Sequence, residues 1–237
     1  MVLTDDNFCT IVEAVKEGRG LFENIKKAIH FLLATNIGEI VVVFMGLVLG
    51  LKTPLLAIQL LWINLVTDSL PAISLGLEKN DSNIMNKKPR NPKKGLFADG
   101  LWTMIFTEGI MIGCLTLFSF SLGNKLYGLD VGRTMAFVSL GMLELVHSFN
   151  IKSEQSILKI GLFENKFLIG SFILGTILQI GVVANPIISS YFKVVPLNSI
   201  QWIYTVAISI LPVFIIEIQK KFNEIKYGRV VYTKLEN

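Results

Sequence analysis

Long apolar runs alternate with short polar or turn-rich segments along almost the whole chain. A helix needs about 20 predominantly apolar residues to cross roughly 30 Å of hydrocarbon. Runs of about this length lie at residues 28–51, 55–77, 101–122, 133–150, 167–188 and 200–218. The fourth run is short and contains Glu144, so hydropathy supports it least. The pattern predicts an all-α membrane protein, a six-helix transmembrane bundle with a short N-terminal stub.

Composition and charge indicate how the bundle is oriented. Hydrophobic residues make up 52% of the 237, and the mean hydropathy is +0.59, which is too high for an ordinary soluble domain. Both termini share one side with eighteen of the 22 Lys and Arg residues, and the other four are Lys52, Lys125, Arg133 and Lys193. Because basic residues accumulate on the cytoplasmic side, we expect an integral multi-pass protein with both termini and the stub cytoplasmic.

The basic excess also bears on the partners of the chain. It is explained by topology and by contact with the lipid bilayer, whose cytoplasmic leaflet carries anionic headgroups. Nucleic acid is not an expected partner, because the sequence contains no recognition motif for it.

Two of the expected spans carry carboxylates and amides that hydrocarbon normally excludes. In the first span, Asn36 and Glu39 are three residues apart and share one face of a helix. In the second, Asn64, Thr67 and Asp68 follow the i, i+3, i+4 pattern and form one polar stripe. Polar and charged residues inside a membrane usually mark a path for an ion or a substrate.

Pro71 follows this stripe closely. It cannot donate a backbone hydrogen bond, and it disfavours helix in the residue before it, so we expect the second span to break near Asp68–Pro71. Carbonyl oxygens exposed at the break, together with the nearby side chains, would make an all-oxygen site. Such a site suits a hard cation such as Ca²⁺, and soft metals are disfavoured because neither Cys nor His joins the cluster.

Either stripe alone has a simpler explanation, since Asn and Thr often form hydrogen bonds between membrane helices. Glu39 and Asp68 together are harder to explain in that way. Like charges on consecutive spans, in a medium of low dielectric constant, need a cation or bound protons nearby. We therefore interpret the two stripes as a cation site that binds protons when empty, so that cation binding releases protons.

Other polar residues in or near the spans have simpler interpretations. Glu108 lies within the first two turns of the third span and Glu217 in the last turn of the sixth, so both could snorkel to the interface. His30 and His147 lie near helix ends, where capping or interfacial roles are more common than proton relay. These four residues are expected to be structural.

Two glycines in the third span predict a helix contact. Gly109 and Gly113 form a small-xxx-small pair, which lets two helix backbones approach closely. We expect this pair to pack against the first span near Gly38.

Several motifs resemble those of one known family. They are Asp5–Phe8 (DDNF), Val12–Arg19 (VEAVKEGR), Asn36–Glu39 (NIGE), Gln59–Ala72 (QLLWINLVTDSLPA), Ile84–Lys93 (IMNKKPRNPK) and Thr134 through Glu144. This series resembles the carboxyl-terminal part of type IIA P-type ATPases, the class of the sarco/endoplasmic reticulum calcium pump. The resemblance implies that residues 1–20 end a phosphorylation domain. It also implies that residues 21–237 form the C-terminal cation-ATPase membrane domain, whose six spans correspond to the fifth to tenth transmembrane helices of the family.

The resemblance also implies metal ligands. These would be Asn36 and Glu39 on the fifth family helix, Asn64, Thr67 and Asp68 on the sixth, and Glu144 on the eighth. Asp68 would bridge two calcium sites, of which one is nearly complete in this chain. The other also needs a Glu and backbone carbonyls from a fourth family helix. Calcium is the transported ion that this ligand set implies, while Mn²⁺ and Na⁺ remain alternatives.

Catalytic motifs of the same family do not occur in these 237 residues. They are the nucleophile motif Asp-Lys-Thr-Gly-Thr, the magnesium loop Gly-Asp-Gly-x-Asn-Asp and a nucleotide domain. We therefore expect the C-terminal membrane half of an ATP-driven cation pump, not catalytic by itself, with Mg²⁺ and ATP acting only in the full-length parent.

Its expected partner is an N-terminal half with the first four helices and the actuator, phosphorylation and nucleotide domains. The alternative is a stand-alone remnant that serves as a passive cation pathway or a membrane assembly partner.

Overall fold

The computed structural model describes residues 8–79, 84–86, 95–97, 100–152 and 165–235, and the elements in these ranges are helical. The long helices are α1 (Phe8–Val48), α4 (Leu101–Tyr127), α5 (Leu129–Ile151), α7 (Lys166–Ala184) and α9 (Ser199–Leu235). The second span consists of α2 (Ala57–Trp62), the π-helical turn η1 (Ile63–Asp68) and α3 (Ser69–Gly76). Two short elements are the 3₁₀ turn η2 (Ile84–Asn86) and α8 (Pro186–Phe192).

Six helical segments in the described part of the chain are long and apolar enough to cross a membrane, which confirms the predicted six-helix bundle. The described residues exclude most of the Asp5–Phe8 motif and residues 87–93 of the loop motif, so these expectations lie outside them.

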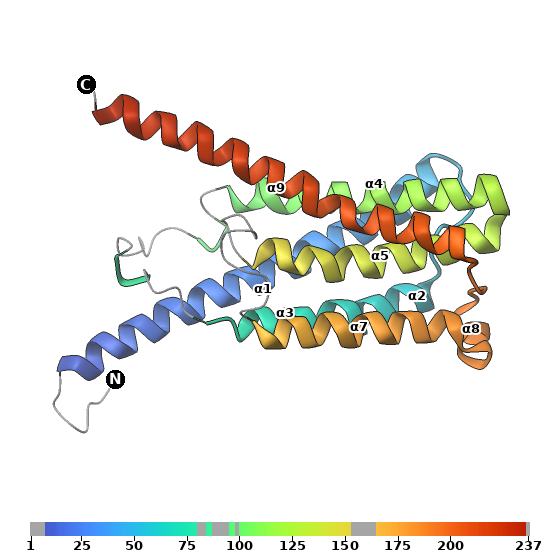
Figure 1. The fold of residues 1–237 in the computed structure, drawn as a ribbon, viewed down its shortest axis with the longest axis horizontal. Coiled ribbons are helices and arrows are strands. Elements are labelled where there is room, and N and C mark those ends of the chain that lie inside the picture. The colour runs from blue at the N-terminus through green and yellow to red at the C-terminus, as the bar shows by residue number, and fades with distance from the viewer. Residues whose placement is uncertain (1–7, 80–83, 87–94, 98–99, 153–164, 236–237) are drawn as a thin grey trace.

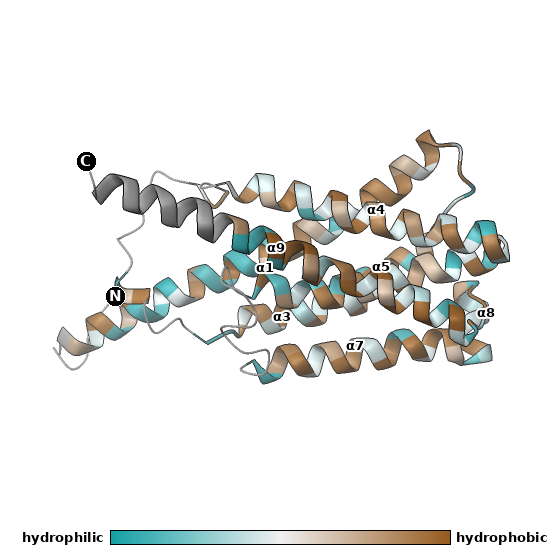
Figure 2. Ribbon diagram, turned by 45° about the horizontal axis from the view of Figure 1, so that its top comes forward, coloured by the Kyte–Doolittle hydropathy of each residue, from teal (hydrophilic) through white to brown (hydrophobic). Residues whose placement is uncertain are grey.

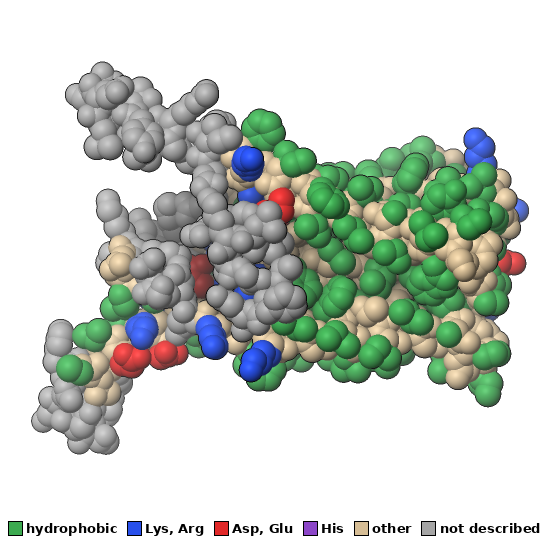
Figure 3. All heavy atoms as spheres, viewed as in Figure 1, with side chains coloured by type: hydrophobic (Ala, Val, Ile, Leu, Met, Phe, Trp, Pro, Cys, Tyr) green, Lys and Arg blue, Asp and Glu red, His purple; other side chains and the backbone are tan. Residues whose placement is uncertain are grey.

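The long helices run side by side, and α1 and α9 extend beyond the others at the same end of the bundle (Figure 1). We refer to this end as the projecting end. Hydrophobic side chains cover the middle of the face seen in Figure 3, with Lys and Arg at its two ends. In Figure 2, α7 is mainly hydrophobic, whereas the projecting part of α1 mixes hydrophilic and hydrophobic residues.

Helix α5 forms the centre of the bundle. In its most apolar window, 89% of the residues are buried within the protein, against 33–44% in the other five spans. It packs against α1, α4, α7, α9 and η1. This position explains why its run is weakly apolar, with a hydropathy of 1.3 against 2.2 for α7. A helix surrounded by protein need not be as apolar as one that faces lipid.

The structure differs from three expected boundaries. The first span lies in the longer helix α1, a single helix of 41 residues that begins at Phe8, so the described residues do not confirm a separate stub. The fifth span, expected to reach residue 188, ends at Ala184. Asn185 stops it there, since its side chain accepts hydrogen bonds from the N–H groups of Ile187 and Ile188 and caps α8. The sixth span lies in the longer helix α9.

The second span also differs from the expected break near Asp68–Pro71. The chain stays helical there, but the regular α-helical pattern is replaced in η1 by a π-helical turn. Pro71, in the first turn of α3, has no N–H to offer the carbonyl of Thr67, and the wider turn accommodates this missing bond. The span is therefore interrupted without being unwound.

Glycines let α1 and α4 pack at very short range. A Cβ atom at Gly109 would lie 2.7 Å from the carbonyl oxygen of Ala34, and one at Gly113 would lie 2.6 Å from Cγ1 of Val41. A Cβ at Gly38, on the facing helix, would lie 2.9 Å from a methyl carbon of α4. The predicted contact of Gly109 and Gly113 with α1 near Gly38 is confirmed.

Replacing Gly109 by Ala should therefore weaken the bundle. The added Cβ would meet backbone that cannot move aside, and overpacking of this kind costs about 1–3 kcal/mol. We expect a lower midpoint of thermal unfolding for Gly109→Ala in detergent. Gly170→Ala is the matched control, because a Cβ at Gly170 meets nothing within 4 Å. Equal midpoints for the two variants would contradict this account of the α1–α4 contact.

Candidate cation site

Carboxylates from three elements meet inside the bundle. Glu39 of α1 is 8% exposed, Asp68 at the end of η1 is 1% exposed, and Glu144 of α5 is fully buried. Asn36 and Asn64 are half-buried, and Thr67 is fully buried. These are the six residues that the sequence predicts as ligands.

Glu39 is held by the second span. Its Oε1 accepts a hydrogen bond of 2.6 Å from Nδ2 of Asn64, which also donates to the carbonyl of Leu60 at 3.0 Å. Asn36 is oriented differently, because its Nδ2 donates to the carbonyl of Leu32 on its own helix at 2.6 Å. The structure thus brings Glu39 and Asn64 together, and no hydrogen bond joins Asn36 to the other predicted ligands among the described residues.

Asp68 and Glu144 form the deeper part of the cluster. The Thr35 hydroxyl donates to Oδ2 of Asp68 at 3.0 Å, and the Thr67 hydroxyl donates to Oε2 of Glu144 at 2.9 Å. The carboxyl groups of Asp68, Glu144 and Glu39 lie near enough to act on one another electrostatically. In the described structure Oδ1 of Asp68 and Oε1 of Glu144 are buried without a hydrogen-bond partner.

The π-helical turn decides where the second-span side chains point. The sequence predicts that Asn64, Thr67 and Asp68 share one face. In the structure Asn64 and Asp68 contact residues of α1, whereas Thr67 contacts Glu144 of α5. The stripe is therefore divided between two helices, with η1 between them. The Ser69 hydroxyl donates to the carbonyl of Asn64 at 3.0 Å, so this carbonyl already has a partner.

Gln179 of α7 supports this arrangement through contacts with the second span and α5. It is fully buried, its Oε1 accepts from Nε1 of Trp62 at 3.0 Å, and its Nε2 donates to the carbonyl of Phe137 at 3.0 Å. It also lies against Gly141, where a Cβ atom would meet the Gln179 amide at 3.0 Å and Thr67 at 3.2 Å. The small residue lets α5 and η1 approach closely, one turn before Glu144.

The cluster as described is held together by hydrogen bonds. No group of three or more His, Cys, Asp and Glu side chains in the described ranges is arranged to hold a metal ion. The side chains that donate hydrogen bonds to its carboxyl groups are Asn64, Thr35 and Thr67. Each of them can also present an oxygen atom to a cation once its N–H or O–H group turns away. The groups that could bind an ion are therefore carboxylate, amide and hydroxyl oxygens, which fits a hard cation.

Sequence reasoning missed Thr35 as a member of the cluster. It is fully buried and bonded to Asp68, four residues before Glu39 on the same helical face. The available signal was its place beside Asn36 in a run that is otherwise apolar.

Glu108 was interpreted wrongly from the sequence. It is 7% exposed and does not snorkel, because its Oε2 lies 2.6 Å from Nε2 of His30 and 3.4 Å from Nε2 of His147. The capping or interfacial role expected for the two histidines is also wrong, since both are buried within the bundle. The contacts join α1, α4 and α5, a combination that no spacing along the chain indicates.

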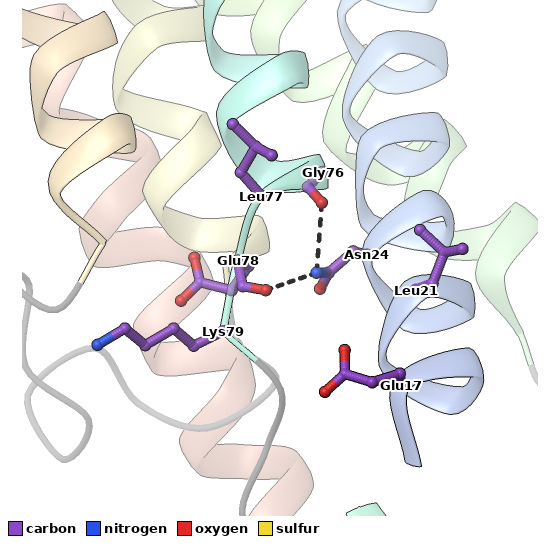
Figure 4. A pocket seen from close by; sticks show the side chains of 7 residues that line it. All are labelled: Glu17, Leu21, Asn24, Gly76, Leu77, Glu78 and Lys79. Carbon is purple, nitrogen blue, oxygen red and sulfur yellow. Dashed lines mark hydrogen bonds between the residues drawn. The ribbon is translucent and has the colours of Figure 1, made fainter. Parts of the chain in front are cut away.

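A separate pocket of about 270 Å³ lies at the projecting end (Figure 4). It is lined by Glu17, Leu21, Asn24, Gly76, Leu77, Glu78 and Lys79. The Asn24 side chain donates to the carbonyls of Gly76 and Glu78, which ties α1 to the end of α3. The Glu78 carboxylate points away from Asn24 and is bonded by Asn165. The pocket is therefore distinct from the carboxylate cluster and lacks its converging oxygens.

Comparison with known proteins places the chain in a family. Residues 52–222 match the family model described as "Cation transporting ATPase, C-terminus". The chain is 42% identical to a calcium-transporting ATPase of Bacillus cereus over 238 aligned residues, covering 93% of this chain and 27% of that protein. It is 38% identical to one of Bacillus subtilis, covering 91% and 24%, and 37% identical to one of Lactococcus lactis, covering 93% and 25%.

The chain thus spans about a quarter of the length of these relatives. The matched region contains five of the six spans and, with them, Asn64, Thr67, Asp68 and Glu144. The match agrees with the resemblance carried by the second-span motif. The chain belongs to the family formed by the carboxyl-terminal membrane region of cation-transporting ATPases.

Proposed function

We propose that this chain is the C-terminal membrane half of an ATP-driven calcium pump. It supplies the ion ligands Asn36, Glu39, Asn64, Thr67, Asp68 and Glu144 and the helices that couple them to the rest of the pump. ATP and Mg²⁺ act in the N-terminal half, which carries the phosphorylated aspartate.

One observation supports this proposal most directly. Oδ1 of Asp68 and Oε1 of Glu144 are buried in the middle of the bundle without a hydrogen-bond partner in the described structure. A buried charged oxygen without a partner costs more than the roughly 1–3 kcal/mol of a neutral group. Either a proton shared by the two carboxyl groups or a bound cation removes this cost. The pair of carboxyl groups therefore favours exchange of a proton for a cation.

Calcium binding requires a modest rearrangement of these residues. Asn64 and Thr67 present hydrogens to Glu39 and Glu144 in the structure. Rotation of the Asn64 amide and of the Thr67 hydroxyl would present their oxygens instead. Calcium accepts six to eight oxygens at flexible geometry, so backbone carbonyls and an element of the partner half can complete the shell.

The projecting end is the proposed cytoplasmic side. The sequence supports this side, because eighteen of the 22 basic residues fall in segments that the predicted topology assigns to the side of both termini. The projecting part of α1 also exposes apolar side chains spaced along its length, namely Val12, Val15, Leu21 and Ile25, with exposed fractions of 39–59%. Such residues suit contact with the phosphorylation domain of the partner half, which would connect ATP chemistry to Glu39 through a single helix.

Asp68→Asn should abolish phosphoenzyme formation at the calcium concentrations that support it in the wild-type form of the complete pump that contains this region. The substitution removes the charge that η1 brings to the cluster, and we expect the calcium requirement to rise about 100-fold or more. Phosphorylation from labelled ATP at graded calcium concentrations measures this.

Asp130→Asn is the matched control, because Asp130 is exposed at the opposite end of the bundle. Normal phosphoenzyme with wild-type calcium dependence in Asp68→Asn would refute the site. Phosphoenzyme that depends on Mn²⁺ or Na⁺ in place of calcium would change the ion and keep the pump.

Calcium binding should release protons from the purified chain in detergent. The carboxyl groups of the cluster exchange protons for the cation, so the calcium affinity should fall by about tenfold per pH unit for each proton displaced. Titration with calcium in a weakly buffered solution containing a pH indicator measures the release, which should shrink in Glu144→Gln. Calcium binding at constant affinity across the pH series would contradict this exchange.

A further inference from the structure

A second cluster of titratable side chains lies in the bundle, apart from the predicted ligands. His30 of α1, Glu108 of α4 and His147 of α5 converge on one atom, Oε2 of Glu108. Nε2 of His30 lies 2.6 Å from it and Nε2 of His147 lies 3.4 Å from it. His30 is 9% exposed, Glu108 is 7% exposed and His147 is fully buried.

Glu108 lies beside a close contact between α1 and α4. Gly109, the next residue, touches the backbone of α1, since a Cβ atom there would lie 2.7 Å from the Ala34 carbonyl oxygen. Within the described part of the chain, the two imidazoles are the partners of Glu108. A carboxylate buried in this way is strongly destabilising unless an opposite charge is paired with it.

Other charged groups on the neighbouring elements have contacts elsewhere. On α9, Lys220 pairs with Glu217 at 3.5 Å and donates to the carbonyl of Asn150 at 2.9 Å. On α5 and η1, Glu144 and Asp68 belong to the cation cluster. The remaining charged residues near the cluster along α1 are Lys26, Lys27 and Glu23, which lie on the projecting side of His30. Glu108 is therefore balanced by the histidines.

The number of bound protons sets the net charge of the cluster. With two neutral imidazoles it carries a net charge of −1, with one added proton it is neutral, and with two it is +1. A buried group favours the neutral state. The short contact between His30 and Glu108 is typical of a charge-assisted hydrogen bond. His147 is a second place for the proton because its Nε2 lies 3.4 Å from the same oxygen of Glu108, although neither of its ring nitrogens has a hydrogen-bond partner in the described structure.

We propose that His30, Glu108 and His147 form a buried proton-binding centre, separate from the cation ligands, which holds one proton between the two imidazoles and ties α1, α4 and α5 together. The centre does not depend on the proposed pump function, because it rests on these three side chains alone. It lies one helical turn from Glu144 along α5, at His147, so it is placed to respond to changes in charge at the cation cluster.

The small number of histidines in the sequence allows a spectroscopic test of this centre. His30 and His147 are the two histidines of the sequence, so ¹⁵N-histidine labelling reports on this centre alone. In the wild-type chain in detergent at neutral pH, we expect imidazolium signals that amount to one protonated ring per chain. In Glu108→Gln the imidazolium fraction should fall at least severalfold at the same pH. Asp130→Asn is the control, since it removes an exposed carboxylate at the opposite end of the bundle and should leave the fraction unchanged.

Two results would overturn the proposal. One is a wild-type spectrum in which both rings are neutral at neutral pH, a measurement that needs no variant and so does not depend on the folding of Glu108→Gln. The other is an unchanged imidazolium fraction in a folded Glu108→Gln. Loss of calcium binding with normal imidazole spectra would count against the pump and leave the proton centre standing.

Discussion

Burying carboxylates inside an apolar bundle is the constraint on which the rest of this structure depends. The effective penalty is several kcal/mol for each uncompensated ion, while the whole stability of a folded domain is about 5–15 kcal/mol. Glu39, Asp68 and Glu144 would together exceed that stability if all three were ionised and unpartnered. Each of them accepts a hydrogen bond from an Asn or Thr of a neighbouring element, and one oxygen each of Asp68 and Glu144 stays without a hydrogen-bond partner in the described structure.

The packing of the helices follows from holding these groups in place. Gly109 and Gly113 bring α4 against α1, and Gly141 brings α5 against η1. Gln179 connects α7 to both α2 and α5 through its two hydrogen bonds. The π-helical turn in front of Pro71 then directs Thr67 to one neighbour and Asp68 to the other. Close backbone contacts thus form a frame, and the less regular turn that carries the ligands lies within it.

Sequence patterns were sufficient for features that the spacing along a single helix encodes, including one contact between two helices. Apolar run lengths predicted six spans, and the small-xxx-small spacing predicted the contact of Gly109 and Gly113 with α1. Features that depend on three helices were not accessible. Nothing along the chain indicates that the weakly apolar run around Glu144 is central, or that His30 and His147 lie on the same carboxylate.

The candidate site shows the same limit. Its residue types and spacing could be identified, because carboxylates and amides are rare in hydrocarbon. How they pair depends on the backbone of η1, which the sequence predicted to be broken and which is a π-helical turn. Thr35 was overlooked because a hydroxyl on a membrane helix can be satisfied by its own backbone, as it also is here through Leu32.

The position of a bound ion tests the central claim most directly. A crystal structure of this region from crystals grown with calcium would locate the ion. A parallel crystal with Mn²⁺ as an anomalous scatterer would identify its position independently. Our account predicts density between η1 and the helices α1 and α5, with carboxylate oxygens of Asp68 within about 2.3–2.6 Å of calcium. An ion bound away from Asp68 and Glu144, while these carboxyl groups keep their hydrogen bonds to Thr35 and Thr67, would contradict it.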